Sequence, residues 1–302
     1  MHMNMANGRK RLGKSAVTAH KHSIEYRGEH IALLTKHGKE QVIAPRFAEA
    51  LGACVTLVES YDTDQFGTFT RDIPRNGTQL EAARRKARKG MELTGLPIGV
   101  ASEGAFCADP FAGMFPWNIE LVLLIDDRIN IEVCGIAQAP AHQHHGTFST
   151  REALDEFARK AAFPEHFLIV RPEREGDRRI SKDLCDWGSL HQSFSWAKLQ
   201  SSNGQVFVES DLRAHANPSR MHNICTATED LIDRIMSRCP SCIAPGFSVV
   251  ERIAGLPCEF CGAPTRETRA EQFACLLCAH QEIRNRAGLK QADASSCNFC
   301  NP

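Results

Sequence analysis

Residues 77–104 read GTQLEAARRKARKGMELTGLPIGVASEG, a helix pattern that leads directly into a strand pattern. Thr78 and Glu81 have the spacing of a capping box, in which a hydroxyl and a carboxylate each accept a hydrogen bond from an unpaired amide at a helix start. The apolar side chains then recur at helical spacing, at Leu80, Ala83, Ala87 and Met91. This spacing predicts a helix with one narrow buried face, followed by a strand over Ile98–Ala101.

Strand-like and helix-like patterns alternate on both sides of this stretch. Strands are expected at 31–34, 54–58, 119–125, 131–136, 167–170 and 206–208, and helices at 45–51, from 149, after 186 and over 218–236. Such alternation predicts an α/β domain with a mixed central sheet and flanking helices, spanning residues 30–238. Residues 1–29 are polar and lack hydrophobic periodicity, so they are expected to form a disordered tail.

The last part of the chain, residues 239–302, is dominated by cysteine. Eight of the 13 cysteines form four C-x-x-C pairs: Cys239 and Cys242, Cys258 and Cys261, Cys275 and Cys278, and Cys297 and Cys300. Zn²⁺ takes four thiolate ligands in a tetrahedron, so eight thiolates predict two structural Zn(Cys)₄ sites in a double zinc-ribbon module.

The spacing does not determine which two of these C-x-x-C pairs, or zinc knuckles, share one metal ion. Our preferred arrangement joins the two inner pairs in one site and the two outer pairs in the other, with sequential and cross-braced pairings as alternatives. Disulfides are the competing interpretation. They require an oxidising compartment, and the first 30 residues contain no apolar stretch like that of a signal peptide. We therefore expect a reducing, cytoplasmic location.

Charge and hydropathy narrow the range of partners. The chain has 36 basic and 36 acidic residues, and six of each fall within 239–302. A balanced charge does not favour a general attraction to nucleic acid or to anionic membranes. No apolar run approaches the roughly 18 residues of a membrane helix, so no membrane partner is expected. The zinc module is expected to have a structural role or to dock a partner.

Polar groups collect in three places within the predicted α/β domain. Thr35 to Glu40 follows the first strand and contains His37, Gly38 and Lys39, as a phosphate-binding turn would. The predicted helix after Thr78 carries a basic stripe that includes Arg84 and Arg88. Ser102-Glu103-Gly104 places a carboxylate at the end of an apolar strand, where it could hold Mg²⁺ or orient water. A solvated turn is the simpler alternative for the first place and a solvated helix face for the second.

Taken in order, these segments resemble a known superfamily. The stretch 77–104 is similar to the part of the inosine/xanthosine triphosphate pyrophosphatases in which a Gly-Thr-led basic helix runs into a strand with an acidic metal site. IALLTKHGKE (31–40) is similar to their first strand and T-x-N-x-x-K phosphate loop, with His37 in place of Asn and a loop one residue shorter. The whole chain resembles an uncharacterised bacterial domain family of unknown function that ends in a cysteine-rich zinc ribbon.

The resemblance implies a Mg²⁺-dependent hydrolase that releases pyrophosphate from a nucleoside triphosphate, with a non-canonical purine nucleotide as substrate. Glu103 would hold Mg²⁺ and Lys39 would neutralise phosphate. The implied substrate-binding residues are Thr35, His37, Arg75, Thr78, Arg84, Arg88, His215, Asn217 and Arg220. The alternative function is a non-catalytic adaptor whose zinc ribbons bind a protein or RNA partner.

Two further groups are weighed as sites. Asp62 and Asp64 are candidates for a second acidic contact or for a capped loop. The cluster His142, His144 and His145 has metal-ligand spacing, although a polar loop after Pro140 is the favoured explanation, because no acidic or thiol partner is adjacent.

Overall fold

The structure is a computed structural model that describes residues 25–59, 61 and 77–302. Within these residues the contacts define two compact units, Tyr26–Leu231 and Ile232–Pro302, and the long helix α5 (Pro218–Met236) runs from the first into the second. The described part of the chain is a mixed α/β protein with three sheets and five α-helices. No helix in this part is both long and apolar enough to cross a bilayer.

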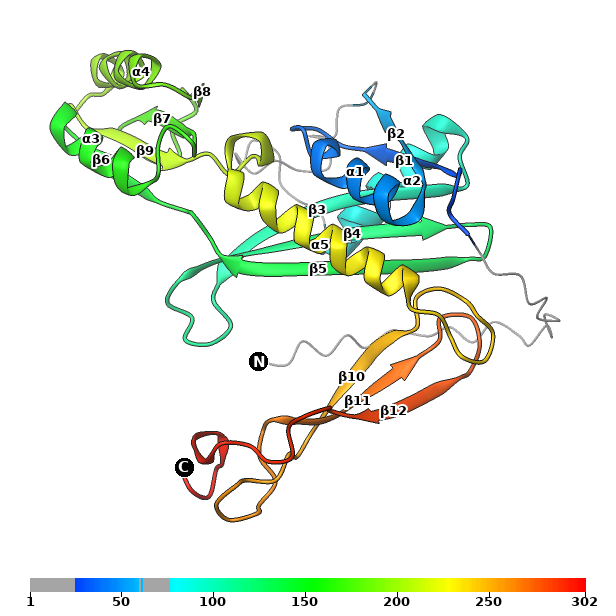
Figure 1. Cartoon of the computed structure of the whole chain (residues 1–302). Helices are drawn as coiled ribbons and strands as arrows, with labels where there is room; N and C mark the ends of the chain where they lie inside the picture. Colours follow the sequence, from blue (N-terminus) through cyan, green and yellow to red (C-terminus); the bar gives the residue numbers. More distant parts are fainter. Residues whose placement is uncertain (1–24, 60, 62–76) are drawn as a thin grey trace. The chain divides into compact units, whose positions relative to one another are not determined.

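The first sheet has the strand order β2-β1-β3-β4-β5 (Figure 1). Its strands are β1 (His30–Leu34), β2 (Cys54–Val58), β3 (Ile98–Ala108), β4 (Pro116–Asp126) and β5 (Ile131–Pro140). The strands β2, β1 and β3 run parallel, whereas β4 and β5 follow β3 as antiparallel hairpins. This is the mixed sheet that the sequence predicts.

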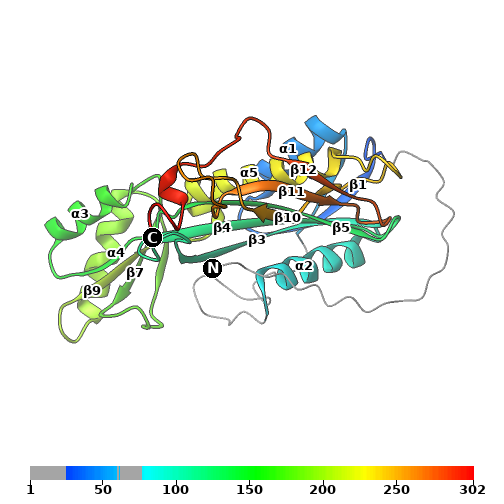
Figure 2. The ribbon, with the colours of Figure 1, turned by 90° about the horizontal axis from the view of Figure 1, so that it is seen from below.

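Helices cover both faces of this sheet, with α2 (Gln79–Thr94) on one face and α1 (Glu40–Leu51) and α5 on the other (Figure 2). The predicted capping box of α2 is present, because Thr78 accepts from Glu81 N and the Glu81 carboxylate accepts from Thr78 N. Ala83, Ala87 and Met91 pack against Leu121, Leu123 and Ile125. On the opposite face α5 lies so close to Gly135 that a Cβ there would overlap the helix backbone.

The second sheet has the order β6-β9-β7-β8, and its neighbouring strands are antiparallel. Its strands are β6 (His145–Phe148), β7 (Leu168–Pro172), β8 (Ser181–Leu184) and β9 (Val206–Ser210). The helices α3 (Arg151–Lys160) and α4 (Trp187–Gln200) bury Leu154, Leu190 and Phe194 in the core beside this sheet. Asp186 caps α4 as predicted, whereas Thr150 rather than Ser149 caps α3.

The unit Ile232–Pro302 contains a third sheet of antiparallel strands, β10 (Ser248–Ala254), β11 (Thr268–Ala274) and β12 (Gln281–Asn285). The C-x-x-C knuckles lie before, between and after these strands. At the other end of the chain, the tail expected over residues 1–29 falls mostly outside the described residues. Its last part is packed, since the Tyr26 side chain is only 2% exposed.

Candidate active site and metal centres

The candidate site lies where β1 stops and β3 continues. β1 pairs with β3 only at Ala32↔Gly99 and Leu33↔Val100, whereas β3 runs on to Ala108 beside β4. The strand expected over 98–101 is therefore seven residues longer, and Glu103 lies in mid-strand rather than at a strand end. The site still lies beyond the carboxyl end of the parallel strand β1, where open α/β sheets place their ligand sites.

Lys39 lies beside this exposed stretch of β3. It is the N-cap residue of α1, and its Nζ donates to the Ser102 carbonyl at 3.1 Å and lies 3.5 Å from Ser102 Oγ. The Lys39 side chain is buried. The segment Thr35–Glu40 therefore meets Ser102–Gly104.

Two ion pairs surround this contact. The Glu103 carboxylate pairs with Lys86 Nζ from α2, and Glu120 Oε1 on β4 accepts from Arg220 Nε at 2.6 Å. Glu103, Glu120 and Arg220 are all buried. Buried charges are retained only where they are paired or bind a charged ligand. Two carboxylates and three cations thus lie around this stretch of β3 and β4.

The two pairs approach from opposite faces of the sheet. Gly104 lies directly across from Glu120, whereas Glu103 lies across from Leu121, which packs against α2. Gly104 leaves the space that the second pair needs, because a Cβ there would lie closer than 3.0 Å to Glu120 Oε1 and to Arg220 Nη2. A side chain at residue 104 is therefore excluded by the ion pair.

A polar network holds Arg220 in place. Asn217 Oδ1 accepts from Arg220 N at 3.0 Å, and the Leu212 carbonyl accepts from Arg220 Nη1 at 2.7 Å. Asn118 Nδ2 donates to Glu120 Oε1 at 3.0 Å, while Asn118 Oδ1 accepts from Asn223 Nδ2 at 2.8 Å. Glu120 Oε2 has no hydrogen-bond donor in the described part of the chain. One buried carboxylate oxygen is therefore available to a ligand.

The surroundings of Lys39 lower its pKa. Burial, followed by the positive charge of Arg220, lowers the pKa of Lys39 from 10.5 to about 7, with Glu103 opposing the shift and Lys86 adding to it. A buried amine loses the hydration that stabilises its charged form. Lys39 therefore changes its charge near neutral pH, which is unusual for lysine and typical of functional sites.

The sequence did not single out Lys86, Glu120 or Asn118, although each leaves a signal. Asn118 and Glu120 are two residues apart in the apolar strand β4, so they lie on the same face of it. Lys86 lies one helical turn from Ala83, on the side of α2 that faces the sheet. In both cases the sequence signal is a polar residue at a position that the strand or helix period places on the buried face.

The other predicted substrate residues have different surroundings. The ring of His37 stacks on that of His215 at 4.9 Å, which brings the loop before α1 next to the segment that leads into α5. His215 Nε2 also lies 3.2 Å from Asp183 Oδ1. Thr35 Oγ1 donates to the neighbouring Lys36 carbonyl, and the Thr78 hydroxyl caps α2.

The basic stripe of α2 is used mainly in ion pairs away from the cluster. Arg84 pairs with Glu132 at 2.7 Å and Arg88 with Asp127. The remaining predicted residues, Arg75, Asp62 and Asp64, lie outside the described residues.

The histidine cluster does not form a metal site. His142 stacks on His166 with 4.6 Å between ring centroids. Among the described residues, the groups of three or more ligand atoms close enough to share one ion consist of cysteines alone. The His142 region is thus part of the packing around the segment before α5.

Eight cysteines form two Cys₄ groups that could hold metal ions, Cys239, Cys242, Cys275 and Cys278 in one and Cys258, Cys261, Cys297 and Cys300 in the other. Within each group all Sγ atoms lie within 4.8 Å of one another, and the separations include 3.5 Å from Cys242 to Cys275 and 3.9 Å from Cys258 to Cys300. A tetrahedral ion with metal–sulfur bonds of about 2.3 Å requires separations of about 3.8 Å. All these cysteines are free of disulfides.

The preferred pairing was wrong. The first C-x-x-C pair joins the third and the second joins the fourth, which is the cross-braced alternative. The reason lies in the sheet: β10 and β11 carry the chain away from the first group to the second and back again. At the second Cys₄ group, the backbone of Cys258 pairs with that of Ala292 in an isolated parallel β-bridge. This pairing brings the fourth C-x-x-C pair next to the second.

Backbone amides prepare these thiols for metal binding. Hydrogen bonds from the backbone amides of Cys300 and Phe299 lower the pKa of the Cys297 thiol to about 7. A hydrogen bond with the Cys261 thiol raises the pKa of the Cys300 thiol to about 12. Four thiols therefore do not ionise together without a cation among them. The donor set fits a thiolate-binding divalent ion.

The described chain is thus a mixed α/β protein with a buried charge cluster and two Cys₄ groups. Its residues 86–302 match the family described as Domain of unknown function (DUF6671), and the chain belongs to that family. The matched region includes Lys86, Glu103, Glu120, Arg220 and all eight paired cysteines, whereas Lys39 precedes it. No curated protein matches the chain.

Proposed function

We propose that the protein is a Mg²⁺-dependent nucleoside triphosphate pyrophosphohydrolase with the inosine triphosphatase-like fold. The observation that carries the proposal is the meeting of Lys39, Glu103 and Arg220 beyond the end of β1. These residues are 64 and 117 positions apart in the sequence. Their meeting in a buried cluster requires a reason, since an ion pair buried for stability alone is seldom favourable.

Each residue has a distinct part in this proposal. Glu103 would hold Mg²⁺, since carboxylates, together with substrate phosphates, are its usual ligands. Glu120, on the opposite face of the strands, pairs with Arg220. The bound ion would neutralise phosphate charge and orient the attacking water. Lys86 pairs with Glu103, and Arg220 and the charged form of Lys39 bind the phosphates.

Water is the only co-reactant that this hydrolysis needs. The water oxygen forms a bond to the α-phosphorus, and the bond from that phosphorus to the oxygen bridging to the β-phosphate breaks. The water proton passes to a carboxylate of the cluster. The products are a nucleoside monophosphate and pyrophosphate.

We also propose that both Cys₄ groups hold structural zinc. All-thiolate donor sets with tetrahedral spacing are typical of Zn²⁺, and such sites are closed to substrate. Thiols that must stay reduced for this purpose support a cytoplasmic location.

The test is a panel of canonical and deaminated purine and pyrimidine nucleoside triphosphates, incubated with and without Mg²⁺. Pyrophosphate and orthophosphate are measured separately, because release of pyrophosphate distinguishes cleavage at the α-phosphorus from loss of the terminal phosphate. The proposal expects Mg²⁺-dependent pyrophosphate from at least one nucleotide. Release of orthophosphate alone would contradict it.

A second candidate function, an adaptor, is favoured by one specific observation. Phe260 and Phe299 occupy the same position in the two knuckles of one Cys₄ group, and they are 85% and 79% exposed. Exposed aromatic pairs are typical of interaction sites. The balanced charge of residues 239–302 favours a protein partner over RNA.

The adaptor is tested with the double variant Phe260→Ser and Phe299→Ser. Crosslinking in native cells should identify a partner of the wild-type chain that the variant loses while keeping its metal content. Single-stranded RNA tested by fluorescence polarisation is expected not to bind. Identical crosslinks for the two chains would contradict the adaptor.

A further inference from the structure

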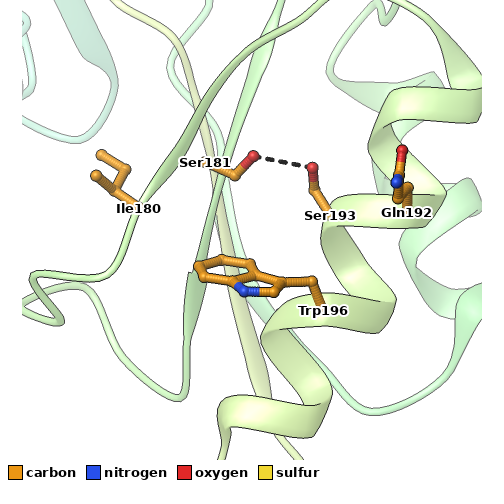
Figure 3. A pocket seen from close by; sticks show the side chains of 5 residues that line it. All are labelled: Ile180, Ser181, Gln192, Ser193 and Trp196. Atoms are coloured by element: carbon orange, nitrogen blue, oxygen red, sulfur yellow. Dashed lines mark hydrogen bonds between the residues drawn. The ribbon is translucent and has the colours of Figure 1, made fainter.

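A small pocket in the second sheet's layer lies apart from the charge cluster. Its volume is about 300 Å³, and it is lined by Ile180, Ser181, Gln192, Ser193 and Trp196. Figure 3 shows the Trp196 indole reaching from α4 toward β8, with the hydroxyls of Ser181 and Ser193 above it in that view. This volume is at the lower end for small-molecule sites, which suits a single ring.

None of the lining residues carries a charge. Lys182 follows Ser181 along β8, and successive strand residues point to opposite faces. Arg179 precedes the pocket, and its guanidinium is occupied by Asp177 and by the Gln200 carbonyl at 2.8 Å. A phosphate or carboxylate would find no countercharge here, so the pocket fits an uncharged ligand.

The lining combines one apolar face with several hydrogen-bonding groups. Trp196 lies outside the core face of α4, which is formed by Leu190, Phe194 and Ala197, and it is 37% exposed. Ser181 Oγ and Ser193 Oγ are 2.9 Å apart, and each hydroxyl can form a further bond. The Gln192 amide and the Trp196 N–H have no hydrogen-bond partner in the described part of the chain.

From this lining we infer that the pocket binds an uncharged ring that has one apolar face and a hydroxyl-bearing edge, the chemistry of a sugar ring. The apolar face stacks on Trp196, and the edge bonds to the serine hydroxyls and to Gln192. A free glycoside and the ribose of a nucleoside share this chemistry. The site is independent of the proposed hydrolase centre.

The test is saturation-transfer NMR on the full chain, with methyl glucoside, galactoside and mannoside in one arm and uncharged nucleosides in the other. At least one compound is expected to receive saturation from the wild type, and Trp196→Ala should abolish the transfer. Leu199→Ala is the matched control, because Leu199 lies on the same helix, is 85% exposed and does not line the pocket. It should leave the transfer unchanged.

Two more variants separate the possible outcomes. Glu103→Gln should not alter the transfer, which keeps this test apart from that of the hydrolase centre. Combined Ser181→Ala and Ser193→Ala changes should weaken binding about tenfold, as expected for lost hydrogen bonds to the ligand. Absence of transfer to all compounds, or equal transfer to wild type and Trp196→Ala, would overturn the inference. Thermal unfolding confirms that each variant is folded.

Discussion

At the scale of single residues, the absence of a side chain at Gly104 is what permits the Glu120–Arg220 pair. We predict that Gly104→Ala lowers the free energy of unfolding by about 2–3 kcal/mol, since a methyl group inserted into a packed interior forces its neighbours apart. Urea unfolding measures the change. Gly176→Ala is the control, because nothing lies within 4 Å of a Cβ there. Equal effects of the two substitutions would show that the space beside Gly104 is not required.

Lys39 gives a prediction about pH. Because its pKa falls from 10.5 to about 7 on folding, the unfolded chain binds the proton more tightly. The cost of burying the charge is fully present below pH 7, declines as the pH rises from 7 to 10.5 and is absent above that range.

The free energy of unfolding of the wild type, measured relative to Lys39→Met, should therefore rise between pH 6.5 and pH 9.5. The expected rise is about 3 kcal/mol, since one pKa unit corresponds to about 1.4 kcal/mol. The comparison with Met cancels all other titrating groups. A difference between the two proteins that does not vary with pH would mean that Lys39 keeps an ordinary pKa.

At the scale of elements, the sequence predicts what is local and misses what depends on neighbours. The capping box of α2 depends on residues close together in the sequence, and it is present. Ser102-Glu103-Gly104 has the composition of a turn, yet pairing with β4 extends β3 through it. The sequences of the short strands β6 and β8 do not alternate between apolar and polar residues, so these strands were not predicted.

In the candidate site, too, the residues that sequence could indicate are those whose position depends on local structure. Lys39 and Glu103 could be nominated from residue type and position, because each follows an expected strand, whereas Arg220 was implied by the resemblance. Their partners Lys86 and Glu120 could not, since only the packing of α2 and β4 brings them there. The knuckle pairing depends likewise on how far β10 and β11 carry the chain, which spacing alone does not determine.

The cross-braced pairing predicts which cysteine changes act together. Cys242→Ser with Cys275→Ser should remove one equivalent of zinc, because both belong to one group. Cys242→Ser with Cys261→Ser should remove both equivalents. Metal analysis of protein purified without chelator measures the content, and the wild type should contain two equivalents. Loss of both equivalents in the first double variant would instead support either the inner-with-inner or the sequential pairing.

At the scale of the whole molecule, the two units differ in what stabilises them. The unit Ile232–Pro302 has few large buried apolar side chains, among them Phe247 and Leu256, whereas the unit Tyr26–Leu231 has a large core. A small domain with so little core needs a further source of stability, which metal ions bound at the two Cys₄ groups would supply. Chelation should therefore speed amide hydrogen exchange in β10, β11 and β12 well before it affects β3 and β4. Simultaneous loss of protection in both units would contradict this division.

The central claim is that the cluster around Glu103 hydrolyses nucleotides, and the rate of Mg²⁺-dependent pyrophosphate release tests it most directly. Glu132→Gln is the matched control, because Glu132 also lies in the first sheet and pairs with a cation of α2. The account predicts that Glu103→Gln lowers the rate about 100-fold or more while Glu132→Gln keeps it near the wild-type value. No pyrophosphate from the wild type with any nucleotide, or equal rates for Glu103→Gln and the wild type, would contradict the account.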